Sequence, residues 1–231
     1  MTDFDLSRLD DVPDPLGGAA PARPDGGPSI DVAALPPSPT RGRVHASRAV
    51  ALAGALLFDA AWIAFVERRP DIGSLPAWSV ALGLGLPLIA AAAALVAVMQ
   101  PGPRGLGRRF VELAALVCAP PVFFAIGTVA TMPAAAHTGP FVGPALRCIG
   151  VAGVLAAGPF AFGLLAIRRS FASAAAWRTA ALGVACGGLA AATMSIVCPN
   201  SEPLHVVVAH GAMMLVYGLA GALAAGRVTR A

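Results

Sequence analysis

Six apolar runs of about twenty residues, separated by short polar segments, restrict the fold of this chain more than any other feature. A single helix needs about 20 apolar residues to cross the hydrocarbon core of a bilayer. The pattern therefore predicts an all-α fold, a polytopic membrane bundle of six transmembrane helices. The predicted spans are Ala49–Val66, Leu75–Met99, Phe110–Met132, Cys148–Ile167, Thr179–Cys198 and Val206–Ala225.

The composition agrees with a lipid environment. Hydrophobic residues make up 57% of the chain and charged residues only 12%, whereas a soluble domain carries about 25% charged residues. A chain this poor in charge cannot cover a water-facing surface, so lipid is an expected partner. The net charge of +4 does not indicate direct nucleic-acid binding, because the arginines lie at the borders of the apolar runs.

Arginine placement predicts the orientation of the bundle. Eleven arginines lie within the ten residues before the first span, in the second and fourth loops or after the last span, against three on the opposite side. Loops rich in Lys and Arg stay in the cytoplasm. We therefore expect both ends of the chain to be cytoplasmic.

The first 47 residues have a different composition from the rest. They hold seven of the twelve acidic residues, and the stretch from residue 13 to 39 is rich in Pro, Gly and Ala. Such a composition favours a disordered or partly helical segment. We therefore predict an N-terminal segment (residues 1–47) followed by a six-helix domain (residues 48–231). Candidate partner-binding residues form two short apolar patches in the segment: Phe4, Leu6, Leu9 and Val12, then Ile30, Val32 and Leu35.

Two cysteines and two of the three histidines on the outer side of the predicted bundle are candidate sensing or metal-binding residues. They are Cys148, Cys198, His205 and His210. Thiolate and imidazole together suit zinc or copper, and two thiols at an oxidising face can instead pair as a disulfide. On a regular helix His205 and His210 point well apart, so they share a metal only if His205 lies in the loop before the helix. The alternative is that these residues only pack or cap helix ends.

Asp59 lies in the middle of the first predicted span. An acidic residue inside a membrane is costly and is a functional candidate by default. As it is the one acid so placed, a hydrogen-bonding or packing role is favoured.

Recognisable catalytic motifs are missing from the sequence, which has no Walker loop, HExxH, GxSxG or CxxC. We therefore do not expect an enzyme. A small transporter or permease subunit, and a membrane thiol oxidoreductase, are the alternative functions.

From about Leu146 onward the chain resembles the NrsF-type family of membrane anti-sigma factors. The shared order is a cysteine (Cys148) that opens the fourth span, the Arg168-Arg169 pair, a Gly/Ala-rich span that ends in Cys198-Pro199, and a last Gly/Ala-rich span that ends in a terminal arginine. The residues from Leu35 to Arg41 also look like the family's approach to the first span.

The resemblance implies a negative regulator of an extracytoplasmic-function sigma factor in the bacterial inner membrane. It further implies that Cys148 and Cys198 sense an envelope signal, such as metal, redox or other stress. The cytoplasmic N-terminal segment would then hold the sigma factor.

Overall fold

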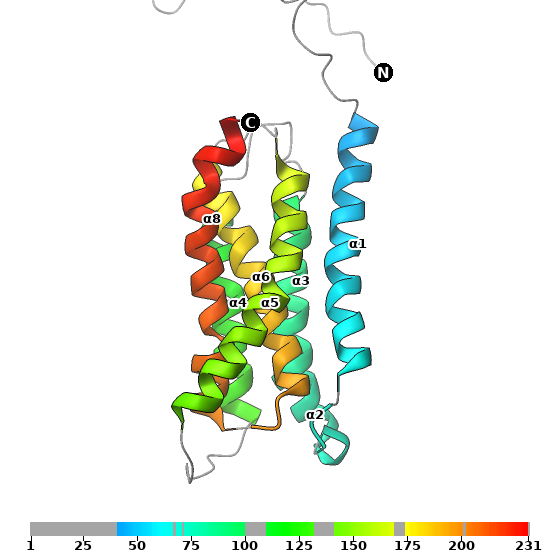
Figure 1. Cartoon of the computed structure of the whole chain (residues 1–231), viewed down its shortest axis with the longest axis vertical. Helices are drawn as coiled ribbons and strands as arrows, with labels where there is room; N and C mark the ends of the chain where they lie inside the picture. The colour runs from blue at the N-terminus through cyan, green and yellow to red at the C-terminus, as the bar shows by residue number, and fades with distance from the viewer. Residues whose placement is uncertain are drawn as a thin grey trace, which may run out of the picture. The chain divides into compact units, whose positions relative to one another are not determined.

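The computed structural model describes residues 41–66, 68–70, 72–99, 110–131, 141–168, 174–200 and 202–230. These residues form helices, turns and connections, and no strand occurs among them. Six helices are long and apolar enough to cross a membrane, which confirms the predicted all-α fold with six such helices. The elements are α1 (Arg41–Phe65), a 3-10 turn (Ile72–Ser74), α2 (Ala77–Val80), a π turn (Ala81–Gly85), α3 (Leu86–Met99), α4 (Phe110–Thr131), α5 (Val142–Ile167), α6 (Ala175–Val197), α7 (Pro203–His205), a second π turn (Val206–His210) and α8 (Ala212–Arg230) (Figure 1).

The predicted spans match these helices, but several predicted limits were wrong. The fourth span begins at Val142 rather than at Cys148, and α1 begins at Arg41 rather than at Ala49. Residues 41–47, assigned to the N-terminal segment, therefore form the first turns of α1. Counting apolar residues finds the part of a helix that fits the hydrocarbon, whereas backbone hydrogen bonds continue the helix into more polar sequence.

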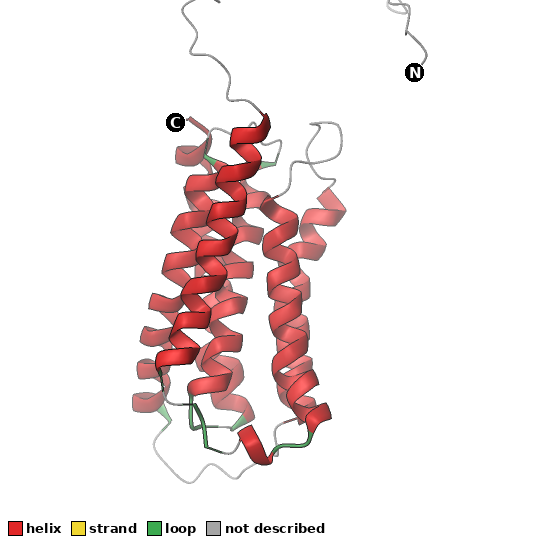
Figure 2. Ribbon diagram, turned by 90° about the vertical axis from the view of Figure 1, so that its right-hand side faces the viewer, coloured by secondary structure: helices red, strands yellow, loops and turns green. Residues whose placement is uncertain are grey.

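The long helices run side by side (Figures 1 and 2). Helix α6 lies at the centre of the bundle, where it packs against α3, α4, α5 and α8 (Figure 1). In α6 83% of the apolar stretch is buried, against 22% in α1 and in α4. Helix α6 consists largely of Ala and Gly, and small side chains allow neighbouring helices to approach from all sides. The centre of the fold is therefore the helix with the smallest side chains.

Helices α6 and α8 make the closest approach in the bundle. A β-carbon on Gly183 would overlap the carbonyl oxygen of Tyr217, and one on Gly187 would lie 2.5 Å from the carbonyl oxygen of Met213. Glycine is thus required where the two backbones touch. This contact holds the middle of α6 against the first turns of α8.

Side-chain hydrogen bonds join neighbouring helices at one end of the bundle and in its middle. At the end where α1 begins, the Arg178 guanidinium donates to the Val98 carbonyl in the last turn of α3, at 3.0 Å from Nη2. A carbonyl in a last turn lacks a helical partner, so the arginine satisfies it. In the middle, the Tyr217 hydroxyl donates to the Gly153 carbonyl at 2.6 Å. These bonds join α6 to α3 and α8 to α5.

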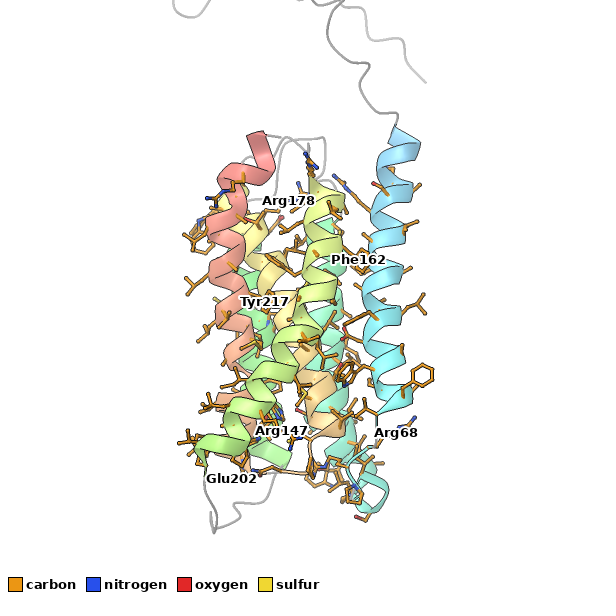
Figure 3. The ribbon with its side chains drawn as sticks, in the orientation of Figure 1. Arg68, Arg147, Phe162, Arg178, Glu202 and Tyr217 are labelled. Carbon is orange, nitrogen blue, oxygen red and sulfur yellow. The ribbon has the colours of Figure 1, made fainter. Side chains whose placement is uncertain are left out.

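We call the opposite end of the bundle, where α1 ends and α5 begins, the far end. Arg68, Arg147 and Glu202 lie there, whereas Arg178 lies at the end where α1 begins (Figure 3). The Arg69 amide donates to the Ile196 carbonyl at 3.0 Å, which holds the segment after α1 against the last turn of α6.

Residues 1–40 lie outside the described residues. The two apolar patches of the N-terminal segment, and its separation from the helical domain, therefore stay predictions.

Candidate metal centre

Four potential metal ligands meet inside the bundle at the far end. They are Cys148, Cys198, His205 and His210, and one ligand atom from each lies within 4.8 Å of all the others. Both histidines are fully buried, Cys198 is 5% exposed, and Cys148 is partly buried. These are the four residues that the sequence analysis selected. We call them the Cys/His centre.

The two cysteines come from different helices. Cys148 lies in the second turn of α5 rather than at its start, because α5 begins at Val142. Cys198 directly follows α6 and has an extended backbone, and its amide donates to the Met194 carbonyl at 2.8 Å. The two Sγ atoms are 3.5 Å apart. The pair therefore joins α5 to the end of α6.

The histidines meet in a way that the sequence analysis did not foresee. His205 does not lie in a loop: it ends α7, and the π turn continues the helix from Val206 to His210. Residues five apart on an α-helix point about 140° apart, whereas a π turn bonds residue i+5 to residue i. The Gly211 amide lies 3.3 Å from the Val206 carbonyl, which is such a bond. The ring centroids of His205 and His210 are consequently only 5.5 Å apart.

Gly211 permits this wide turn. A β-carbon there would overlap the carbonyl oxygen of Val207 and would lie 3.5 Å from the ring of Phe124. A larger residue would therefore push the turn away from its present course. The glycine that ends the turn is thus part of what keeps His210 in the centre.

The spacing of the four ligands suits a tetrahedral ion. Zinc binds thiolates at about 2.3 Å and imidazoles at about 2.0–2.1 Å, which places neighbouring ligand atoms about 3.4–3.8 Å apart. The Sγ atoms are 3.5 Å apart, and Cys198 Sγ lies 3.7 Å from His205 Nε2. Two thiols and two imidazoles are a donor set typical of a closed zinc site. The centre can therefore hold a metal ion of the zinc class with small adjustments.

The same thiols allow a second chemistry. Cys148 and Cys198 are free cysteines, and a disulfide requires their sulfur atoms to approach to about 2.05 Å. Oxidation accounts for the two cysteines but gives no role to two fully buried histidines. The complete set of four therefore favours metal binding over a simple disulfide switch.

The other selected residues do not join the centre. Asp59 is 5% exposed in α1, and neither carboxylate oxygen has a hydrogen-bond partner. Asp59 therefore makes no side-chain hydrogen bond among the described residues. Of the two roles expected from the sequence, the packing role stays a prediction.

A serine that the sequence analysis missed touches the centre. Ser195 is 2% exposed in the last turn of α6, and its Oγ lies 3.4 Å from Nδ1 of His210. The sequence could not identify this serine. A serine in a helix of small residues looks the same in sequence whether or not it contacts a metal-binding residue. Only the packing of α6 against the π turn reveals the contact.

Comparison with known proteins agrees with the resemblance noted from the sequence. Residues 31–230 match the NrsF family, described as negative regulator of sigma F. No match was found among curated proteins or among solved structures. The matched region contains all six candidate spans and the whole Cys/His centre. The chain therefore belongs to the NrsF family of negative regulators of a sigma factor.

Proposed function

We propose that this chain is an inner-membrane anti-sigma factor, and not an enzyme, that holds an extracytoplasmic-function sigma factor with its N-terminal segment. A change at the Cys/His centre loosens that hold. The observation that carries the proposal is the buried group of two thiols and two imidazoles at the far end of the bundle, opposite the start of α1. Such a centre can respond to an envelope signal without the signal entering the cell.

The proposed signal is a metal ion of the zinc class, with copper or thiol oxidation as the other chemistries that the donors allow. Binding of an ion by all four residues links Cys148 of α5 to the chain between α6 and α8. The position of α5 thus depends on the state of the centre. Helix α5 is therefore the first element that the signal moves.

Helix α1 is the element that can carry this movement to the N-terminal segment. It packs chiefly against α5, and a β-carbon on Gly158 would lie 3.3 Å from the Phe58 ring. On its buried side Arg48, Asp59 and Trp62 have side-chain polar atoms without hydrogen-bond partners. A buried polar group left in this state costs about 1–3 kcal/mol. These polar atoms therefore weaken the packing of α1 against the rest of the bundle. We infer that α1 shifts when α5 moves.

The acidic N-terminal segment suits a sigma factor as its partner. Proteins that bind DNA carry basic surfaces, and opposite charges speed and orient association. The two apolar patches supply short anchors that fold on the partner.

Binding of the sigma factor should depend on the first apolar patch. In the full chain, Leu6→Ala combined with Leu9→Ala should weaken binding at least about tenfold, since burying one leucine contributes about 1.5–3 kcal/mol. The measurement is co-purification and affinity of the full chain in nanodiscs with each extracytoplasmic-function sigma factor of the same organism. Leu16→Ala, in the same segment but outside both patches, is the matched control and should bind normally. Absence of binding by the unaltered chain would overturn the proposed function.

The proposed orientation places both termini in the cytoplasm and the Cys/His centre near the periplasm. Its support is the excess of arginines in the sequence segments just before the first span, in the second and fourth loops and after the last span. Reporters fused after residue 20 and after residue 202 should report opposite sides of the membrane. If both report the same side, the centre cannot receive an external signal while the N-terminal segment holds a cytoplasmic partner.

A further inference from the structure

Ser195 is placed to set the chemical state of one histidine in the Cys/His centre. Its Oγ lies 3.0 Å from the Ala191 carbonyl oxygen and 3.4 Å from His210 Nδ1. Ser195 lies one turn before Cys198 and is buried together with His210. The hydroxyl thus contacts the centre without offering it a ligand of its own.

The number of available protons decides which atom of the Ser195–His210 contact is the hydrogen-bond donor. A hydroxyl has one proton to donate, and a carbonyl oxygen can only accept. Because Oγ donates to the Ala191 carbonyl, it must accept from His210, so that Nδ1 carries the hydrogen. A neutral imidazole has a single N–H. His210 Nε2 therefore keeps its lone pair.

The surroundings of Nε2 support the same tautomer. This atom is buried and has no hydrogen-bond partner among the described residues. The opposite tautomer would bury an N–H without an acceptor, at a cost of about 1–3 kcal/mol. A lone pair on Nε2 is instead available to a metal ion.

We propose that Ser195 is the positioning residue of this centre, which orients His210 and presents its Nε2 to the metal. The inference rests on the metal binding given under Proposed function. Histidines that bind metals commonly donate their other N–H to an acceptor, which fixes the ring and its tautomer. Here the π turn brings the ring to the centre, and the Ser195 hydroxyl fixes which nitrogen faces the ion.

The test measures zinc affinity of the full chain in nanodiscs by competition with a chromophoric chelator. Ser195→Ala should weaken zinc binding about 10–100-fold, the usual effect of losing such a partner. Ser195→Thr keeps the hydroxyl and should bind within a few-fold of the unaltered chain. With Co²⁺ as probe, the visible spectrum should be that of a tetrahedral sulfur–nitrogen site in the unaltered chain and in Ser195→Thr, and altered in Ser195→Ala. Without metal, Ser195→Ala should still form the helical bundle but unfold at a lower temperature, because the buried N–H of His210 loses its acceptor.

A double-mutant cycle makes the result independent of how well Ser195→Thr folds. If Ser195 acts through His210, Ser195→Ala should have no further effect on zinc affinity once His210→Ala is present. Additive losses, or normal zinc affinity in Ser195→Ala, would overturn the positioning role. Failure of the unaltered chain to bind zinc or Co²⁺ would instead overturn the metal part of the proposed function, whatever the Ser195 variants do.

Discussion

Gly183→Val should prevent the six-helix bundle from assembling. A β-carbon at this position overlaps the carbonyl oxygen of Tyr217, and a backbone oxygen cannot rotate away as a side chain can. Overpacking usually costs about 1–3 kcal/mol and sometimes more. We expect the upper end here, because α6 is the central helix and α8 would have to separate from it. The measurement is the yield of folded protein after detergent extraction and its thermal unfolding midpoint.

Gly150→Val is the matched control for this variant. Gly150 lies inside α5, and nothing stands within 4 Å of a β-carbon built on it. Both substitutions replace a helical glycine by the same β-branched residue, so any change in helix propensity is shared. Equal stability of the two variants would show that the close approach of α6 and α8 does not hold the bundle together.

Cys198→Ser should uncouple the protein from its signal while the sigma factor stays bound. A hydroxyl is a poor substitute for a thiolate ligand, and loss of a direct ligand should exceed the 10–100-fold loss typical of outer partners. We therefore expect zinc affinity to fall by more than about 100-fold. A sigma-dependent reporter should then remain repressed when zinc is added.

Hydrogen exchange gives a second readout for Cys198→Ser. In the unaltered chain, zinc should change the exchange of the α1 amides, because the proposed route passes from Cys148 through α5 to α1. The variant should lose this change. Cys118→Ser removes an exposed cysteine of α4 and should respond as the unaltered chain does. A normal zinc response in Cys198→Ser would rule out the Cys/His centre as the sensor.

Much of the fold follows from short-range sequence features. Each span is a predominantly apolar run of about twenty residues, so its existence depends on the hydrocarbon thickness and not on its neighbours. The predicted helix ends were less accurate. Helix α5 begins six residues before Cys148, the predicted start of the span, because residues 142–147 are also helical. The four members of the Cys/His centre were also selected from the sequence, since thiols and imidazoles near one membrane face are few.

The geometry of the centre required the tertiary structure. The sequence spacing of His205 and His210 indicates divergent side chains on an α-helix, and a π turn reverses this conclusion. No residue type marks a π turn as reliably as proline or glycine marks other turns. Ser195 likewise acquires its role only through contact with a histidine fifteen residues away on another helix.

The sequence by itself therefore determined that six helices are long and apolar enough to cross a membrane, and which side chains could bind a metal. These properties depend on the local density of apolar and soft-ligand residues. Only the tertiary structure decided that two thiols and two imidazoles share one buried centre, and that a serine directs one of them. Those properties depend on distances between helices, which the packing of glycines in α6 against α8 sets.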